Sequence, residues 1–265
     1  MTDEIYIQRC IDLAQKGIRA VAPNPMVGCV IVVNDKIIGE GYHQRYGEAH
    51  AEVNAINNVA NKSLLNKATL YVSLEPCSHT GKTPPCAELI IKSGIKKVVV
   101  GTKDPNPIVG GKGIEKLKNR GIEVKEGILQ EQCLELNKRF FTYHEKQRPY
   151  VILKWAQTLD GFLDRIRDDE TQKINWISEP ETKTIVHKWR SEEQSILVGR
   201  NTITNDNPSL TVRDYGGINP IRLVIDSQLQ IGGELNIYSK DAPTIVFNRI
   251  KNETENNVEW VKIKE

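Results

Sequence analysis

The chain has 265 residues, of which 39% are hydrophobic and 26% charged, so it can build one large domain or two with a sizeable core. Lys and Arg (36) nearly balance Asp and Glu (34), which argues against a protein that binds nucleic acid or a membrane surface by charge. Five scattered cysteines, no apolar run near the roughly 20 residues of a membrane span and no N-terminal signal segment predict a cytoplasmic protein whose cysteines bind metal or are buried.

The first half of the chain alternates helix and strand patterns. Apolar residues at three- and four-residue steps predict a helix over 4–18. Further predicted helices cover 51–60, 86–94, 111–121 and 131–144, and predicted strands cover 27–33, 36–42, 68–74, 96–101 and 122–129. Such alternation predicts a layered α/β domain that ends near residue 146, with a polar linker at 145–149.

The second half carries another α/β pattern. It comprises a predicted helix at 180–193 and predicted strands at 150–156, 195–199, 220–227, 243–248 and 258–264. One helix would cover the faces of an open sheet poorly. We therefore expect domains at 1–146 and 147–265, and we expect the chain to be a C-terminally incomplete version of a longer protein.

Four residues form a pattern typical of a metal site. His50 and Glu52 are two residues apart, and side chains with this spacing converge only where a helix begins, with His50 at the cap and Glu52 in the first turn. Cys77 follows a predicted strand, and Cys86 opens a predicted helix nine residues later. One imidazole and two thiolates would hold Zn²⁺ with a fourth position open for water, as in catalytic zinc sites. We expect helix N-termini at both cysteines to favour their thiolate forms.

Plainer interpretations exist for each of these residues. His50 is equally typical of a surface helix cap, Glu52 of a first-turn partner for the helix dipole, and the cysteines of small buried side chains. Their joint order, with H-A-E followed by strand, Pro-Cys and a helix-opening Cys, matches the zinc-deaminase layout and favours the metal site.

Longer stretches carry a resemblance to a known family. The stretches are "APNPMVGCV" (22–30), "GEGYHQRYGEAHAEV" (39–53), "SLEPCSHTGKTPPC" (73–86) and "KDPNP" (103–107). They resemble the riboflavin-biosynthesis bifunctional deaminase/reductase family across nearly the whole chain. The eight residues between Cys77 and Cys86 differ from the Cys-x-x-Cys of nucleic-acid deaminases.

The resemblance implies a cytidine-deaminase-like three-layer α/β/α domain followed by a dihydrofolate-reductase-like α/β domain, incomplete at its C-terminus. The first domain would hydrolyse the 2-amino group of 2,5-diamino-6-(5-phosphoribosylamino)pyrimidin-4(3H)-one, giving 5-amino-6-(5-phosphoribosylamino)uracil. Zinc held by His50, Cys77 and Cys86 would activate water, and Glu52 would move protons. The implied substrate pocket is lined by Asn24, His43, His79, Lys82 and Asn106.

The second domain, by the same resemblance, uses NADPH to reduce the ribosyl group to a ribityl chain. The implied substrate contacts are Lys154, Asp160, Arg190, Leu210 and Arg213, and the implied cofactor contacts are Ala156, Trp176, Thr202, Asp206 and Ser227. Arg190 and Arg213 suit a bidentate clamp on phosphate. Members of the family continue for roughly another hundred residues, within normal domain sizes, and 164–173 is longer and more charged than the family pattern.

Two other functions stay open at the level of sequence. One is a nucleoside or tRNA zinc deaminase, which the cysteine spacing and the near-neutral charge disfavour. The other is a noncatalytic zinc-stabilised module, whose site would be closed by a fourth ligand such as Cys29 or His79. For the leading function we expect a small phosphorylated pyrimidine as the partner, no nucleic acid or membrane, and a homo-oligomer of two or more chains.

Overall fold

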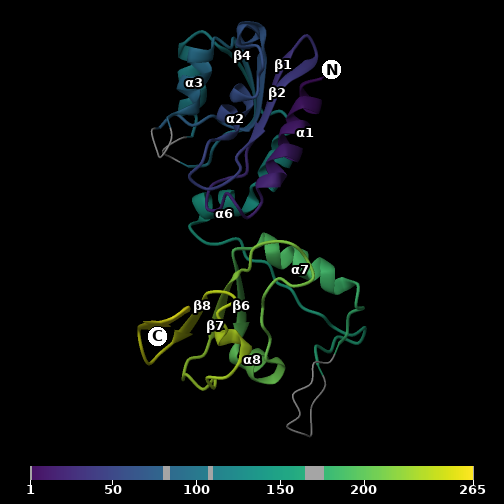
Figure 1. The fold of residues 1–265 in the computed structure, drawn as a ribbon, viewed down its shortest axis with the longest axis vertical. Coiled ribbons are helices and arrows are strands. Elements are labelled where there is room, and N and C mark those ends of the chain that lie inside the picture. The colour runs from purple at the N-terminus through teal and green to yellow at the C-terminus, as the bar shows by residue number, and fades with distance from the viewer. Residues whose placement is uncertain (1, 80–83, 107–109, 165–175, 265) are drawn as a thin grey trace. The chain divides into compact units, whose positions relative to one another are not determined.

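The computed structural model describes residues 2–79, 84–106, 110–164 and 176–264 (Figure 1). The chain divides into two compact units, Met1–Ile152 and Leu153–Glu265. No helix within the described ranges is both long and apolar enough to cross a membrane. We describe each unit by itself.

A five-stranded mixed sheet forms the centre of the first unit. Its strands, in spatial order, are β2 (Lys36–Tyr42), β1 (Gly28–Val33), β3 (Thr69–Leu74), β4 (Lys97–Thr102) and β5 (Glu123–Glu126). β1 is antiparallel to both β2 and β3, whereas β3, β4 and β5 are parallel. The carboxyl ends of β3 and β4 therefore lie side by side at one edge of the sheet.

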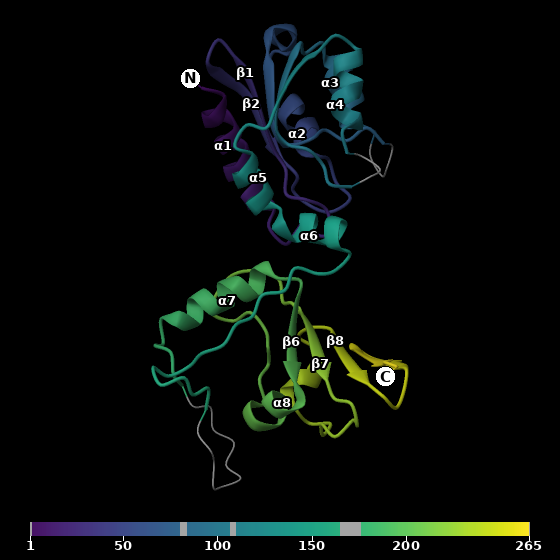
Figure 2. The same cartoon turned by 180° about the vertical axis from the view of Figure 1, so that it is seen from behind.

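Helices cover both faces of this sheet, as Figures 1 and 2 show from opposite sides. They are α1 (Asp3–Ala14), α2 (Ala51–Asn57), α3 (Cys86–Ser93), α4 (Lys112–Asn119) and α5 (Gln130–Leu136), with 3₁₀ turns at Gln15–Gly17 and Lys62–Lys67, whereas α6 (Lys138–Lys146) lies beyond one end of the sheet. Alternate residues of β1 enter two cores: Cys29 and Ile31 pack with α2, α3 and α4, and Val30 and Val32 pack with α1. This is the predicted three-layer α/β/α arrangement.

The helix predicted over 131–144 is two helices in the structure. The chain breaks at Asn137, whose buried side chain donates to the Met26 carbonyl and accepts from the Met26 N–H, both at 2.8 Å. A contact 111 residues away in the chain overrides local helix periodicity here. The predicted linker also begins too early, because α6 continues to Lys146.

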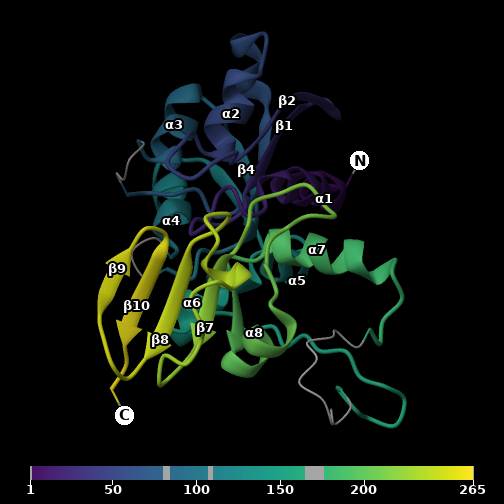
Figure 3. The same ribbon diagram turned by 60° about the horizontal axis from the view of Figure 1, so that its bottom comes forward.

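The second unit has a five-stranded sheet of its own. The spatial order is β6 (Ser195–Gly199), β7 (Ile221–Ile225), β8 (Thr244–Asn248), β10 (Val258–Lys262) and β9 (Glu253–Glu255). All neighbouring pairs are parallel except β9 with β10, which Figure 3 shows at one side of the sheet. Helices α7 (Thr182–Glu192) and α8 (Arg200–Asp206) and a 3₁₀ turn at Asn236–Tyr238 complete the unit.

One prediction for this half is wrong, and one helix was not predicted. Residues 150–156 were expected to form a strand, yet they have no regular structure and are mostly exposed, so the apolar run pairs with neither sheet. Helix α8 was not predicted, because its Asn- and Asp-rich sequence is typical of turns. Its Ile203 is fully buried in the core of the unit, and this packing supplies what helix propensity does not.

Candidate active site

The chemically active side chains of the first unit meet at strand ends and helix N-termini. His50 is the N-cap of α2, and Glu52 lies in the first turn of that helix, as the two-residue spacing predicts. Cys86 is the first residue of α3, again as predicted. Cys77 follows β3 outside any helix, which corrects the expectation of a helix N-terminus there. Its thiol instead accepts the N–H of Cys86 at 3.3 Å.

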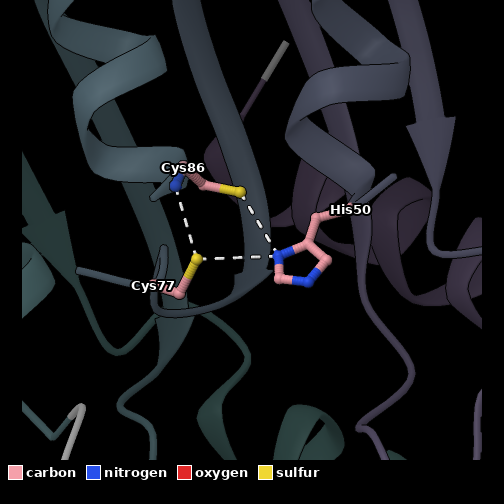
Figure 4. A group of neighbouring side chains, drawn as sticks. All are labelled: His50, Cys77 and Cys86. Atoms are coloured by element: carbon pink, nitrogen blue, oxygen red, sulfur yellow. Dashed lines mark hydrogen bonds between the residues drawn. The ribbon is translucent and has the colours of Figure 1, made fainter. Parts of the chain in front are cut away.

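The three predicted ligands form one cluster (Figure 4). The Nδ1 atom of His50 lies 3.6 Å from Sγ of Cys77 and 3.4 Å from Sγ of Cys86. Tetrahedral zinc, with Zn–S near 2.3 Å and Zn–N near 2.0–2.1 Å, separates a sulfur and a nitrogen ligand by about 3.6 Å. The donor set and its spacing therefore fit zinc, and His50 makes no side-chain capping bond that would support the plain helix-cap interpretation.

No fourth ligand joins the cluster among the described residues. Within the part of the chain that the structure describes, the group with ligand atoms within 4.8 Å of one another is His50, Cys77 and Cys86, and it includes neither Cys29 nor His79. Three protein ligands with a fourth position open to water are the mark of a catalytic rather than a structural zinc site.

The pKa values of the two thiols shift in opposite directions. Hydrogen bonds from the Cys86 thiol, from His50 and from the Cys86 N–H lower the pKa of Cys77. The hydrogen bond with Cys77, together with burial, raises the pKa of Cys86. Hydrogen bonding to Cys77 also raises the pKa of His50. Hydrogen bonding thus favours the thiolate form of Cys77.

Glu52 lies beside the cluster without belonging to it. Its side chain is only 3% exposed. Burial raises its pKa to about 7, and the nearby Cys77 adds to the shift. A carboxyl group that titrates near neutrality can both take and give a proton, which is the requirement for a general acid–base.

Asn24 and His43 of the expected pocket are in contact. His43 Nδ1 lies 3.1 Å from the Ala49 carbonyl, which only accepts, so Nδ1 carries the proton in this arrangement. Nε2 then accepts from the Asn24 amide at 3.2 Å. The His43 ring also packs edge-on to the His50 ring, 5.2 Å between centroids. These contacts bring both residues to the metal cluster.

The remaining residues of the expected pocket are His79, Lys82 and Asn106. His79 is exposed, two residues beyond Cys77, and Asn106 lies in the segment after β4. Lys82 lies outside the described residues. Asp104, near Asn106, has a pKa raised to about 6 by burial, and its electrostatic neighbours include His79 and Cys77. The segment after β4 is therefore close to the segment after β3.

Sequence reasoning missed the polar residues that fix the loops of this site. Asn137 holds the backbone of Met26, two residues from Asn24. Glu75 is 4% exposed and accepts hydrogen bonds from four backbone N–H groups. A Glu at the end of an apolar strand, directly before Pro-Cys, was a signal that could have identified it.

In the second unit the structure brings Arg190 and Arg213 together. Arg190 donates to the Thr211 carbonyl at 2.7 Å, and Arg213 donates to the Thr211 hydroxyl at 3.4 Å. His187, which sequence reasoning passed over, accepts the Arg213 N–H through Nδ1 at 3.1 Å and faces Asp214 with Nε2 at 3.4 Å. Burial lowers the pKa of Arg190, with Arg213 contributing, and its Nε is buried without a partner among the described residues.

The remaining expected contacts are spread more widely. Leu210 is buried next to Thr211, with a φ of 53°, whereas Lys154 and Asp160 are exposed in the segment before 165. The expected cofactor contacts are placed on α8 (Thr202 and Asp206), just after β7 (Ser227) and in segments without regular structure (Ala156 and Trp176). Lys183 lies over the Trp176 ring at 4.1 Å.

Family models match both parts of the chain. Residues 1–102 match the cytidine and deoxycytidylate deaminase zinc-binding region, and residues 149–263 match the RibD C-terminal domain. Similar curated proteins are the riboflavin biosynthesis proteins RibD of Aquifex aeolicus (46% identical, covering 95% of this chain and 69% of the relative) and Bacillus amyloliquefaciens (47%, 92% and 65%). This chain therefore spans about two thirds of the length of these relatives.

Solved structures agree with these matches. A diaminohydroxyphosphoribosylaminopyrimidine deaminase/5-amino-6-(5-phosphoribosylamino)uracil reductase from Thermotoga maritima is 44% identical, with a TM-score of 0.88 over 97% of this chain and 73% of that chain. RibD of Acinetobacter baumannii is 35% identical, with a TM-score of 0.87 over 99% and 74%. The two expected domain folds, cytidine-deaminase-like and dihydrofolate-reductase-like, are thereby confirmed.

Proposed function

Because this chain belongs to the RibD family of riboflavin-biosynthesis proteins, we propose that its first unit is a zinc-dependent deaminase acting on 2,5-diamino-6-(5-phosphoribosylamino)pyrimidin-4(3H)-one. The observation that carries the proposal is the three-ligand cluster of His50, Cys77 and Cys86, with the buried Glu52 beside it. Three ligands leave a place for the reacting water, and the adjacent carboxyl group can move its protons.

The reaction replaces the 2-amino group by oxygen. A bond forms between the water oxygen and C2 of the ring, the bond from C2 to the amine breaks, and ammonia leaves with 5-amino-6-(5-phosphoribosylamino)uracil. Zn²⁺ held by the three ligands would act as a Lewis acid that lowers the pKa of water toward neutrality. Glu52 takes a proton from water and gives it to a ring nitrogen, and it then takes the proton of the new C2 hydroxyl and carries it to the departing amine.

Asn24, His43, His79, Lys82 and Asn106 form the proposed pocket. The contact of Asn24 with His43, and of His43 with the metal ligand His50, supports a place for the first two beside the reacting ring. An amide presents both a donor and an acceptor, which matches the edge of a pyrimidinone. Lys82 supplies a cation for the phosphate.

For the second unit we propose NADPH-dependent reduction of the ribosyl group of the deaminated product to ribityl, with Arg190 and Arg213 as a clamp on the 5′-phosphate. Both guanidinium groups donate to Thr211, which holds the two cations near each other although like charges repel. Two cations held together in this way support a clamp on phosphate. Lys154, Asp160 and Leu210 complete the proposed substrate contacts.

The proposed NADPH contacts are Ala156, Trp176, Thr202, Asp206 and Ser227. Thr202 in α8 and Ser227 after β7 follow the carboxyl ends of two adjacent parallel strands, where open α/β sheets bind nucleotides, so these residues fit the cofactor. NADPH would supply the hydride for the reduction. We assign the deaminase to 1–146 and the reductase to 147–265. A cytoplasmic location and a homo-oligomer stay predictions.

A substrate panel tests the deaminase proposal. The zinc-loaded 265-residue protein should release ammonia from the diaminopyrimidine phosphate and not from cytidine, and removal of the metal by a chelator should abolish the release until zinc is restored. Release from cytidine alone would favour a nucleoside deaminase. Zinc binding without ammonia release from either compound would favour the noncatalytic module.

Consumption of NADPH tests the reductase proposal. With the deaminated phosphate added, NADPH absorbance should fall, and Arg213→Gln should raise KM about tenfold or more by removing one charge-assisted contact. The control is Lys240→Gln, an exposed cation of the same unit outside the clamp. An Arg213→Gln protein with unchanged KM would contradict the clamp.

A further inference from the structure

The carboxylate of Glu75 is buried at the junction of three loops, and its hydrogen-bond partners among the described residues are backbone groups. It follows β3 directly, and its own N–H donates to the Thr102 carbonyl at 2.9 Å, which extends the pairing of β3 with β4 by one step. Two residues later comes the metal ligand Cys77. A buried carboxylate is stable only when hydrogen bonds replace its water.

Backbone N–H groups supply those hydrogen bonds. One oxygen, Oε2, accepts from Asp104 at 3.2 Å and from Gly111 at 2.9 Å, and the other, Oε1, accepts from Gly113 at 2.9 Å and from Ile114 at 3.2 Å. The donors belong to the segment after β4 and to the N-terminus of α4, so one side chain ties both to the end of β3.

Asn106 lies between the two donors of Oε2. Asp104 accepts the Asn106 N–H through its own carboxylate at 2.8 Å, and the Asn106 carbonyl accepts the Gly110 N–H at 2.8 Å. The backbone of Asn106 is thus bonded to Asp104, whose N–H Glu75 accepts, and to Gly110, which directly precedes the donor Gly111.

A close backbone approach independently supports this arrangement. A Cβ atom at Gly113 would lie 1.9 Å from the Pro76 carbonyl oxygen and 3.2 Å from Glu75 Oε1. Only glycine allows α4 to dock this closely on the residue between Glu75 and Cys77.

We propose that Glu75 is a positioning residue of the deaminase site, holding residues 104–106 and 110–114 against the strand end that carries Cys77, and thereby setting the distance of Asn106 from the metal cluster. The inference rests on the proposed function, in which Asn106 contacts the pyrimidine. Glu75 acts through the backbone of that segment and touches neither metal nor substrate.

A double-mutant cycle on ammonia release from the diaminopyrimidine phosphate tests the inference. Glu75→Gln turns an amide NH₂ toward two of the four N–H donors, and kcat/KM should fall about 10- to 100-fold, mainly through KM, as for the loss of one or two charge-assisted hydrogen bonds. In an Asn106→Ala background the same change should cost less than about threefold, because the residue it positions is already gone. Zinc content should stay unchanged in every variant.

Glu88→Gln is the matched control, because Glu88 of α3 forms an ion pair with Lys116 of α4 at 2.6 Å and both side chains are partly exposed. It should leave kcat/KM within about twofold, as expected for a surface pair. Hydrogen exchange gives a second readout: the amides of Gly111, Gly113 and Ile114 should lose protection in Glu75→Gln while those of β1 keep it.

Equal losses from Glu75→Gln in both backgrounds, or unchanged KM with unchanged exchange, would overturn the positioning role. A wild-type protein without ammonia release would instead refute the proposed function. If Glu75→Gln does not accumulate as folded protein, Gly113→Ala takes its place in the cycle, because it displaces α4 from Pro76 with the carboxylate intact. The same non-additivity with Asn106→Ala is expected.

Discussion

At the scale of single residues, the metal cluster depends on local sequence. His50 and Glu52 share one helix start, and Cys86 begins another, so their positions follow from spacing alone. Glu75 could not be assigned in this way, because its four donors lie 29 to 39 residues further along the chain. The side chains that carry the chemistry were therefore predictable, and those that fix the loops were not.

Loss of a ligand should remove the metal. Cys86→Ser replaces a soft thiolate with a weak oxygen ligand, and we expect zinc content to fall from about one per chain to near zero. Metal analysis of the purified protein measures this. Cys29→Ser is the control, because Cys29 is fully buried in the core but lies outside the cluster, and it should retain zinc. Loss of zinc from both variants would favour a closed four-ligand site.

At the scale of elements, packing decides what periodicity leaves open. The apolar run at 150–156 has a strand-like composition, but neither sheet pairs with it. The helix predicted over 131–144 is interrupted because Asn137 reaches the backbone of Met26. Most other helices and strands match their predicted ranges within a few residues, because their apolar faces meet the same two cores that the patterns imply.

The packing of α1 on β1 depends on a glycine. A Cβ atom at Gly28 would lie 2.0 Å from the Cys10 carbonyl oxygen, so Gly28→Ala must push the helix from the sheet. We expect a loss of about 1–3 kcal/mol or more in the free energy of unfolding, measured with denaturant. Gly199→Ala is the control, since its Cβ meets nothing within 4 Å and its φ is −83°. An equal effect in both variants would refute this packing argument.

An ion pair between α1 and β2 should make stability depend on pH. The Arg9 guanidinium donates to both oxygens of Glu40, at 2.6 and 2.9 Å, and this hydrogen bonding lowers the pKa of Glu40. A lowered pKa in the folded state means that the pair stabilises the fold above the ordinary pKa of 4.5 and that this stability is lost as pH falls through the folded value.

Arg9→Gln should therefore cost about 0.2–1 kcal/mol at neutral pH, the range for partly exposed pairs. The cost should vanish at a pH below the folded pKa of Glu40. Denaturant unfolding at several pH values measures it, and Lys16→Gln serves as the control because this lysine lies near Glu40 without being its main partner. A cost that grows toward acid pH would contradict the assignment.

At the scale of the whole molecule, two α/β units follow one another, each with its own sheet and its own proposed chemistry. The first unit presents its reactive groups where parallel strands end and helices begin, and the second holds its arginine pair on Thr211, which precedes β7 in the chain. The resemblance in sequence predicted both folds, since its motifs are spread along the chain. The loop contacts inside each unit did not follow from the sequence, because they join residues far apart in the chain.

Ammonia release per bound zinc by Glu52→Gln tests most directly whether Glu52 moves protons beside the three-ligand zinc site. Gln has nearly the same shape and cannot exchange a proton, so zinc should be retained while the rate of release from the diaminopyrimidine phosphate falls by about 10²–10⁴-fold. Glu48→Gln, at an exposed site close by, should keep the wild-type rate. A zinc-loaded Glu52→Gln protein with the wild-type rate would contradict the account.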